Sequence, residues 1–446
     1  MKQSKRPPGK SQRYGSQRSG PRPPGPAPVS GPPIEIRIDS VGGEGDGVGK
    51  GPDGKTIYTP FALPGELVRV VGGGERRELD KVITPSSQRV EPPCPHFGVC
   101  GGCALQHWEA RAYLDWKVER LRGTLALQHL ETEILPAIAA KPGSRRRLAL
   151  HARKGNRDEA RLGFKERKSW SVVEISRCPV ADPRLDAALP ALRRLAAPLF
   201  EHHKSAPTLH VTLTAAGLDV DISGVEAKSG GLSADARMTL AERAAEADFA
   251  RVTIDGEIAF MARQPTVRFG PATVALPAGA FLQATVEAEA MMSAFVARAA
   301  EGATRIADLY CGVGTFTFPL AAVAPVMAAE MSAPAIRAVT AATATAPGLK
   351  GIVAEARDLV RRPVLAEELK KIDTVVFDPP RSGAAEQSAE LARSSVARVI
   401  GVSCNPATFA RDARTLVDAG FVLKQVLPVD QFLWSPHIEL VGVFER

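Results

Sequence analysis

The sequence lacks an uninterrupted hydrophobic segment and has few aromatic residues, which make up 5% of the chain. Residues 309–329 carry no charge and would be long enough to cross a bilayer, but Gly312, Gly314, Pro319 and Pro325 interrupt them. The 39 glycines and 36 prolines are typical of a water-soluble chain rather than a membrane protein. We therefore expect this stretch to be buried interior and expect no contact with a membrane.

Cysteine is also scarce, with six residues in 446, and the N-terminus lacks the apolar core of a secretory signal. Three of the six cysteines lie within ten residues of one another. This uneven placement argues against a disulfide scaffold and favours metal binding or catalysis in a reducing compartment. We therefore expect a cytoplasmic protein.

Acidic residues are absent from residues 1–33, which hold seven basic residues and nine prolines and account for +7 of the net charge of +8. Such a segment has no hydrophobic period from which a core could form, so we predict a disordered basic tail. Its charge is compatible with two roles, a solubility tail or an electrostatic contact with nucleic acid. The whole chain is long enough for about three domains.

Residues 34–92 predict a small β-barrel. Alternating apolar and polar residues indicate strands near 34–39, 56–59 and 67–71, separated by glycine-rich turns. A small closed barrel needs such turns between its short strands. The sequence of residues 39–47 and the segment PFALPGE at 60–66 resemble the TRAM domain, an OB-like RNA-binding module.

The next segment contains four cysteines that could share one metal centre, in the spacing C-x5-C-x2-C followed by a fourth 75 positions later: Cys94, Cys100, Cys103 and Cys178. The spacing leaves the metal open, because a structural zinc site would use the same ligands and His96 or His107 could replace one of them. Ordinary buried cysteines are disfavoured, since the surrounding CPHFGVCGGC is not an apolar core segment. Four sulfur ligands leave no open position, so we expect a structural role.

Residues 104–135 show a helical pattern of apolar positions. A basic run follows from 145 to 168, interleaved with Phe164 and Trp170. Such a run is compatible with an ordinary solvated face or with contacts to an RNA backbone. Residues 185–265 show strand and helix patterns without recognisable chemistry.

Residues 304–316 predict the first strand, glycine turn and helix of a doubly wound α/β sheet. Gly312 and Gly314 would let the backbone approach a nucleoside cofactor beyond the carboxyl end of the strand. A dinucleotide fingerprint would need a third glycine where Thr317 stands, which disfavours NAD. Glu330 ends the next strand, where a carboxylate can accept hydrogen bonds from ribose hydroxyls. This pattern favours S-adenosylmethionine.

Two further acidic residues follow strands of the same sheet. Asp358 is a candidate contact on the adenine side of the cofactor, although a lone aspartate could equally cap a helix. Strand 375–377 leads to Asp378 in the sequence DPPR. Methyltransferases that act on exocyclic amines have an aromatic residue at the position of Arg381, so simple amino methylation is disfavoured.

A nucleophile follows the next strand, 399–403. Methylation of a pyrimidine carbon requires covalent activation, which a thiolate provides by adding to carbon 6 of uracil, and Cys404 is the candidate. A base must then remove the proton from carbon 5, and Glu439 is the candidate with His437 as the alternative. Cys404 could instead be a buried structural cysteine, as we expect for Cys311 at the glycine turn.

From residue 34 onward, the motifs C-x5-C-x2-C, DLYCGVG, DPPR, SCNP and H-x-E together resemble the TrmA/RumA family of RNA (uracil-5-)-methyltransferases, and within it the iron-sulfur branch that acts on 23S rRNA. The resemblance implies a class I, Rossmann-like methyltransferase domain that uses S-adenosylmethionine. It implies a [4Fe-4S] cluster rather than zinc on the four cysteines, with Cys404 as nucleophile and Glu439 as base. Cofactor contacts are expected from Gln283, Tyr310, Gly312, Gly314, Thr315, Glu330, Asp358 and Asp378.

We therefore expect an α/β fold in four segments: the tail at 1–33, a TRAM-like barrel at 34–92, a small α+β central domain with the cluster at 93–280, and the methyltransferase domain at 281–446. The helix at about 106–135 is expected to pack on the methyltransferase domain. The expected partner is RNA, above all 23S rRNA, bound by a monomer with no protein partner. One alternative is a tRNA (uracil-5-)-methyltransferase, which typically lacks the cluster cysteines. The other is a non-catalytic iron-sulfur RNA-binding protein.

Overall fold

The structure is a computed structural model that describes residues 31–228 and 231–446. The basic tail expected at residues 1–33 lies almost entirely outside the described residues. The described chain divides into two compact units. One consists of the described residues up to Val41 together with Gly47–Pro85, and the other of Gly42–Asp46 together with Ser86–Arg446.

The first unit is an antiparallel sheet with the strand order β3-β2-β1-β4-β5. Its strands are β1 (Ile34–Val41), β2 (Gly47–Lys50), β3 (Thr56–Thr59), β4 (Leu67–Val71) and β5 (Glu78–Thr84). Alternation along β1 buries Ile36 and Ile38 against Val68 and Val70 of β4. The three strands predicted from alternation are confirmed, and the TRAM assignment stays a prediction.

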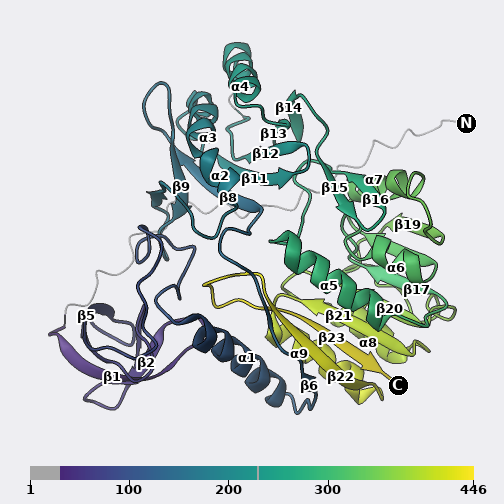
Figure 1. The fold of residues 1–446 in the computed structure, drawn as a ribbon, viewed down its shortest axis with the longest axis horizontal. Helices are drawn as coiled ribbons and strands as arrows, with labels where there is room; N and C mark the ends of the chain where they lie inside the picture. The colour runs from purple at the N-terminus through teal and green to yellow at the C-terminus, as the bar shows by residue number, and fades with distance from the viewer. Residues whose placement is uncertain (1–30, 229–230) are drawn as a thin grey trace, which may run out of the picture. The chain divides into compact units, whose positions relative to one another are not determined.

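The second unit begins with a seven-stranded sheet of order β10-β9-β8-β11-β12-β13-β14. Its strands are β8 (Arg147–Arg153), β9 (Arg161–Lys165), β10 (Val172–Glu174), β11 (Thr208–Thr214), β12 (Gly217–Ser223), β13 (Arg251–Ile254) and β14 (Glu257–Met261). The helical segments are α2 (Pro183–Ala187), α3 (Leu189–Ala196), the 3₁₀ turn η1 (Ala197–Phe200) and α4 (Ala234–Glu246). Leucines of α3 and α4 form one apolar core with this sheet. Figure 1 shows the two helices beside it.

A hairpin of β15 (Thr266–Phe269) and β16 (Ala272–Ala275) leads into a nine-stranded sheet. Its C-terminal strands are β17 (Ile306–Leu309), β18 (Val326–Glu330), β19 (Ile352–Ala356), β20 (Thr374–Phe377), β21 (Arg398–Ser403), β22 (Val422–Asp430) and β23 (Glu439–Glu445). Strands β17 to β21 are mutually parallel, and β23 runs antiparallel between β21 and β22.

Helices cover both faces of this sheet. They are α5 (Val286–Ala299), α6 (Thr317–Val323), α7 (Ala333–Thr343), α8 (Ala385–Arg393) and α9 (Pro406–Asp418). One apolar core joins the sheet to α8 and α9, and a second joins it to α5 and α6. This is the doubly wound α/β arrangement predicted from the sequence, with the crossovers expected of parallel strands.

The helix predicted at 104–135 is shorter than expected, because α1 spans Ala110–Ala126. Glu109 caps its first turn by accepting hydrogen bonds from the backbone N–H groups of Arg111 and Ala112. Beyond its end, His129 adopts a left-handed φ of 52°, which a continuing helix does not allow. The buried residues of α1 are Tyr113, Lys117, Leu121 and Leu125.

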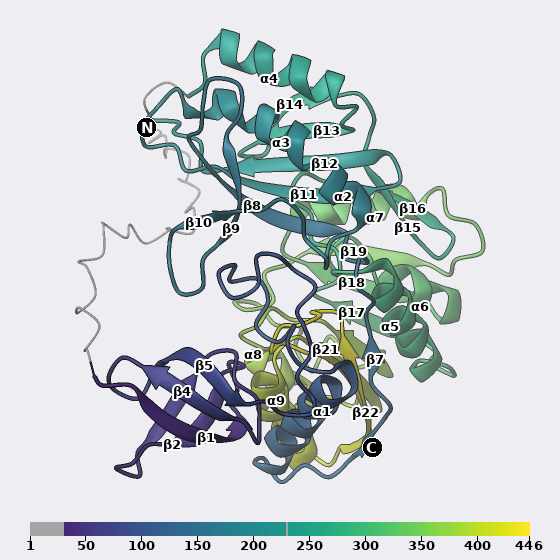
Figure 2. The ribbon, with the colours of Figure 1, turned by 60° about the vertical axis from the view of Figure 1, so that its left-hand side comes forward.

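Two short strands after α1 belong to the C-terminal sheet. β6 (Glu133–Ile134) and β7 (Ile138–Ala139) both pair with β22, the last of the C-terminal strands at that end of the sheet. The helix α1 itself contacts α9 (Figure 2). None of the helices that the structure describes has the length and apolar content needed to span a bilayer.

Candidate active site and cysteine cavity

Strand register gathers the predicted site residues at one edge of the C-terminal sheet. Leu309 of β17 pairs with Ala329 of β18 and with Phe377 of β20, so these parallel strands end at the same level. The residues that follow them, Tyr310, Glu330 and Asp378, therefore meet beyond the carboxyl ends of the strands. This is the edge at which open α/β sheets bind ligands.

The turn after β17 is shaped for a close approach of the backbone to a ligand. Tyr310, Gly312 and Gly314 have φ angles of 60°, 54° and 96°, in the left-handed region. A Cβ atom at Gly314 would lie 2.5 Å from the ring of Phe318, so only glycine fits there. The carboxylate of Glu330 accepts hydrogen bonds from the backbone N–H of Gly312 at 3.4 Å and of Ser332 at 2.8 Å. These bonds fix the glutamate beside the turn.

Carboxyl groups crowd this edge and make it attractive to a cation. Asp308 is fully buried, and burial raises its pKa to about 7, with further contributions from the charges of Asp378 and Glu330. Its carboxylate accepts a hydrogen bond of 2.5 Å from the hydroxyl of Thr317. Burial likewise raises the pKa of Asp378. A ligand with a sulfonium and an ammonium group would relieve this repulsion.

Two further residues expected at the cofactor, Thr315 and Asp358, form hydrogen bonds outside the glycine turn. Thr315 is half-buried, and its carbonyl oxygen accepts a hydrogen bond from the Ser293 hydroxyl at 3.3 Å. Asp358 accepts hydrogen bonds from the backbone N–H groups of Val360 and Arg361, at 3.1 and 3.3 Å. It therefore caps the turn after β19. The alternative role predicted from the sequence was the capping of a helix.

The expected nucleophile and the expected base are brought together by antiparallel pairing. Ser403 at the end of β21 pairs with Leu440 near the start of β23, which places Cys404 and Glu439 at the same edge. Cys404 directly precedes Asn405, the N-cap of α9, and the Asn405 side chain donates a hydrogen bond of 3.0 Å to the carbonyl oxygen of Arg381. The loop after β20 and the turn after β21 are thus tied to each other.

The electrostatic environment of Cys404 does not favour the thiolate in the free protein. Burial, together with the nearby carboxylates of Glu439 and Asp378, raises the pKa of the Cys404 thiol to about 11, although Arg381 opposes this shift. Cys311 is buried at the glycine turn, and burial raises the pKa of its thiol well above the usual value. This is the packing role predicted for Cys311.

Glu439 is 3% exposed and is held by a glutamine that we did not predict from the sequence. The amide nitrogen of Gln431 donates to Oε2 of Glu439 at 2.8 Å and to Oε1 of Gln283 at 2.7 Å. Gln283 in turn donates to Oδ2 of Asp378 at 3.2 Å. Burial and the charge of Asp378 raise the pKa of Glu439, and the hydrogen bond from Gln431 acts in the opposite direction. One network therefore links the residues expected at the cofactor to the expected base.

Two residues of this network had only weak sequence signals. Gln431 directly follows Asp430, the last residue of the buried strand β22. The two form a polar pair after an apolar run. Arg146 belongs to the basic run, yet it is 5% exposed, donates to the Gln283 carbonyl oxygen at 3.1 Å and forms a buried ion pair with Glu289. The interpretation of the whole run as a solvated or RNA-facing surface is therefore wrong for Arg146.

Other members of the basic run do lie on the surface. Trp170 is 70% exposed, and the Lys165 ammonium lies 3.9 Å from the centre of its ring. Arg153 donates a hydrogen bond to the Trp170 carbonyl oxygen at 3.1 Å. An exposed aromatic ring among basic side chains is a suitable surface for stacking and backbone contacts with single-stranded nucleic acid.

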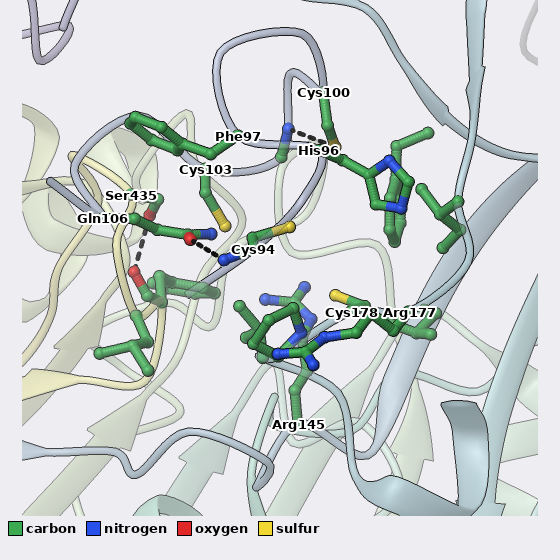
Figure 3. Close-up of a pocket in the computed structure, with 18 of the residues that line it drawn as sticks. Cys94, His96, Phe97, Cys100, Cys103, Gln106, Arg145, Arg177, Cys178 and Ser435 are labelled. Atoms are coloured by element: carbon green, nitrogen blue, oxygen red, sulfur yellow. Dashed lines mark hydrogen bonds between the residues drawn. The ribbon is translucent and has the colours of Figure 1, made fainter. Parts of the chain in front are cut away.

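The four predicted metal ligands line one cavity of about 390 Å³, together with His96. Figure 3 shows Cys94, Cys100, Cys103 and Cys178 around this shared space. The backbone supports them, since the N–H of Cys94 donates to Gln106 and the N–H of Cys178 donates to Asp186. The side chain of His437, the alternative base, lines the same cavity. Its pKa is lowered by burial and by Arg381 and Lys117.

The cysteine cavity fits a sulfur-ligated group by its chemistry. Burial raises the pKa of Cys100, of Cys103 to about 12, and of Cys178, and the negative charges of neighbouring thiolates add to these shifts. Four clustered thiolates need a cationic centre to compensate them. Within residues 31–228 and 231–446, no three Cys, His, Asp or Glu side chains are arranged closely enough to coordinate a metal ion directly.

Comparisons with known proteins identify the family of this chain. Residues 272–446 match the family model described as tRNA (uracil-5-)-methyltransferase. The chain is 64% identical to an uncharacterized RNA methyltransferase of Caulobacter vibrioides, over 92% of this chain and 100% of the relative. It is 32% identical to the 23S rRNA (uracil(1939)-C(5))-methyltransferase RlmD of Chromohalobacter salexigens, over 92% of this chain and 89% of that enzyme.

A solved structure shares the fold over most of the chain. The tRNA (uracil-54, C5)-methyltransferase of Pyrococcus abyssi, in complex with S-adenosyl-L-homocysteine, superposes with a TM-score of 0.70 at 25% identity. The match covers 92% of this chain and 99% of that one. From the site and these relationships together, the chain belongs to the RNA (uracil-5-)-methyltransferase family and is an S-adenosylmethionine-dependent enzyme.

Proposed function

We propose that this enzyme methylates carbon 5 of a uridine in 23S rRNA through a covalent bond between Cys404 and carbon 6 of the uracil. The observation that carries the proposal is the pairing of β21 with β23. It sets Cys404 beside Glu439 at the edge where Asp378 and the glycine turn also lie. A thiol and a carboxylate on one side of a nucleoside-binding edge are the two groups that carbon methylation of uracil requires.

Cys404 would perform the first step of the reaction and Glu439 the last. The Cys404 sulfur, after loss of its proton to solvent, bonds to carbon 6 and leaves carbon 5 nucleophilic. Carbon 5 then takes the methyl group of S-adenosylmethionine as the sulfur–methyl bond breaks and S-adenosylhomocysteine is released. Glu439 removes the proton of carbon 5, the double bond re-forms, and the Cys404 thiolate leaves. One methyl group is transferred and one proton is released per turnover.

The residues around the glycine turn would bind the cofactor. Glu330 would accept hydrogen bonds from the ribose hydroxyls, Gly312 and Gly314 would give close backbone contact, and Asp358 would face the adenine side. Tyr310, Thr315, Gln283 and Asp378 would line the remainder of the site. The carboxyl groups would favour the positively charged cofactor over its neutral-sulfur product, which supports release of the product.

The four cysteines would hold a [4Fe-4S] cluster, whose iron would cross-link residues 94–103 to Cys178 and compensate the thiolate charges. The loop they occupy is joined to β9, because the N–H of Gly101 donates to the carbonyl oxygen of Lys165 at 2.9 Å. A cross-linked loop would therefore steady the strand that leads to the exposed Trp170. We infer that this surface and the TRAM-like unit bind RNA, with the target uridine flipped into the site.

The choice of 23S rRNA over tRNA rests on two observations, the four cysteines and the 32% identity to an enzyme named for 23S rRNA. The Pyrococcus abyssi enzyme is named for tRNA, so both substrates must be compared. Anaerobically purified protein is incubated with labelled S-adenosylmethionine and separate pools of unmodified 23S rRNA, 16S rRNA and tRNA. Nucleoside mass spectrometry should find 5-methyluridine in 23S rRNA alone. 5-Methyluridine in tRNA alone would overturn the proposed substrate and leave the reaction unchanged.

The covalent mechanism has its own test. Cys404→Ala should abolish methylation, whereas Glu439→Gln should leave methylated RNA attached to the protein on a denaturing gel. Cys311→Ala removes a buried thiol of the glycine turn and shows what the loss of a thiol does where no bond to uracil is proposed. Retained methylation in Cys404→Ala would refute the covalent bond, and a Glu439→Gln variant without the adduct would transfer the role of base to His437 or to water.

A further inference from the structure

A lysine on α1 is buried against the segment that leads to the proposed base. The side chains of Lys117 and Asp430 are both fully buried, and the lysine ammonium donates to Oδ1 of Asp430 at 2.6 Å. It also donates to the carbonyl oxygen of Phe432 at 3.2 Å. The ammonium lies 4.7 Å from the centre of the Tyr113 ring, which adds a cation–π contact. One lysine thus holds the residues on both sides of Gln431.

The same face of α1 holds the rest of this segment. The Tyr113 hydroxyl lies 3.5 Å from the carbonyl oxygen of Phe432 and 3.4 Å from that of Ser435. The Arg120 guanidinium donates to the carbonyl oxygen of Pro436 at 2.8 Å. Positions 113, 117 and 120 lie on one helical face. The helix therefore binds the 430–436 segment through the Asp430 carboxylate and the main-chain oxygens of Phe432, Ser435 and Pro436.

This segment carries the groups that orient Glu439. Asp430 is the last residue of β22, Gln431 follows it, and Glu439 begins β23. The Gln431 amide group is fixed at both ends, because its oxygen accepts a hydrogen bond from the N–H of Ala284 at 2.8 Å and its nitrogen donates to Glu439. A shift of Asp430 would move Gln431 and break this arrangement.

An ion pair buried this completely is not explained by stability alone. Removing two charges from water is expensive, and an apolar pair of similar volume is often as stable or more stable. The ion pair instead fixes the positions of its partners. The N–H donors of one ammonium group form good hydrogen bonds only when Asp430 and Phe432 lie within a narrow set of positions.

We propose that Lys117 is a positioning residue for the methylation reaction, which fixes Asp430 and thereby aims Gln431 and Glu439 at the uracil. This inference rests on the proposed function, in which Glu439 removes the proton of carbon 5. Loss of the lysine would slow release of the Cys404 adduct more than it would weaken binding of S-adenosylmethionine, because Gln431 contacts Glu439 directly but would reach the cofactor only through Gln283. The glycine turn and Glu330 lie on other strands.

The test compares Lys117→Met with the double variant Lys117→Met/Asp430→Asn. The single variant leaves a buried unpaired carboxylate and should lower the thermal midpoint. The double variant removes that charge and should recover most of the midpoint. Lys370→Met is the matched control, because this lysine forms an exposed ion pair with Glu367. It should be unchanged within about twofold in every assay.

Rates are expressed per site that binds S-adenosylhomocysteine by calorimetry, so that unfolded protein does not enter the comparison. With unmodified 23S rRNA, both Lys117 variants should lose about 10- to 100-fold in kcat while KM for S-adenosylmethionine changes less than about threefold. Both should accumulate the covalent RNA adduct, as is expected of Glu439→Gln. Wild-type kcat per binding site in the double variant would overturn the proposal.

The two proposals fail in different ways. If Glu439→Gln accumulates the adduct and the Lys117 variants do not, then the positioning role is wrong and the mechanism stands. If none of them accumulates it, the elimination by Glu439 is wrong, and the role of Lys117 is overturned with it. Equal losses in kcat and in cofactor affinity would also count against positioning, since a general loosening of the fold has that effect.

Discussion

The amide nitrogen of Gln431 lies 2.8 Å from Oε2 of Glu439 and donates a hydrogen bond to it. This bond stabilises the ionised carboxylate, whereas burial and the nearby Asp378 stabilise the neutral acid. The fraction of Glu439 that can accept a proton at neutral pH therefore depends on one glutamine side chain.

Replacing Gln431 by leucine should raise the pKa of Glu439 further. Because a base must be ionised to act, the rate rises with pH up to that pKa, and the acid limb of the kcat/KM profile should move to higher pH. We expect a loss of about 10- to 100-fold at pH 7. Gln264→Leu is a suitable control, since its amide donates to the carbonyl oxygens of Pro265 and Leu276. An unmoved acid limb would show that Gln431 does not tune the base.

The Cys404 thiol should respond to the same carboxylate. Glu439 is ionised in the alkaline range where the thiol titrates, and its charge raises the pKa of Cys404. Glu439→Gln should lower that pKa by roughly one unit. The pH dependence of iodoacetamide alkylation at Cys404, measured by peptide mass spectrometry, reports the shift. A midpoint that stays in place or rises would contradict the proximity of the two groups.

The cysteine cavity should lose its metal when one ligand is removed. Cys103→Ser should reduce the iron and acid-labile sulfide of anaerobically purified protein and weaken RNA binding. Binding of S-adenosylhomocysteine should change little, because the cysteine cavity is separate from the glycine turn. Cys311→Ser removes a thiol outside the cavity and should retain its iron. Zinc in place of iron, or iron retained in Cys103→Ser, would refute the proposed cluster.

Asp308 should make the protein less stable as pH rises. Its pKa is raised by burial to about 7, above the unfolded value, so the folded state binds more protons than the unfolded state between those values. The stabilising contribution is present at low pH and is lost as pH rises through about 7. The difference in free energy of unfolding between Asp308→Asn and wild type should therefore shift in favour of the variant by roughly 1 to 3 kcal/mol from pH 5 to pH 8.

Thermal midpoints of both proteins at pH 5 and pH 8 measure this difference. Glu368→Gln is the control, because hydrogen bonds from Arg357 lower the pKa of Glu368 to about 2. Both pH values lie above that pKa, so the effect of this substitution should be similar at each. A difference between Asp308→Asn and wild type that does not change with pH would contradict the raised pKa.

The features predicted best from the sequence are those formed by residues that are neighbours in the chain. The strand, glycine turn and helix around Gly314 and the thiol that follows β21 each rest on neighbouring residues, and the structure brings the predicted site residues to one edge of the sheet. The length of α1 was overestimated at its end because Leu130 and Ile134, which lie beyond the helix, continued the apparent helical period.

Contacts between distant residues could not be predicted in this way. Lys117 and Asp430 lie 313 positions apart, and a lysine in a helical pattern is normally solvated. Arg146 was grouped with its basic neighbours, although it pairs with Glu289 inside the protein. In both cases the partner becomes visible only when the folded chain places two charges in one apolar environment.

The pairing of β6 and β7 with β22 has a consequence for dissecting this enzyme. Residues 272–446 match the family model, yet a fragment cut at that boundary would expose the hydrogen-bonding groups of β22 along a sheet edge. Such a fragment is expected to aggregate through that edge. The smallest portion that could be expressed by itself must therefore begin before β6, and residues 272–446 are not a transferable module.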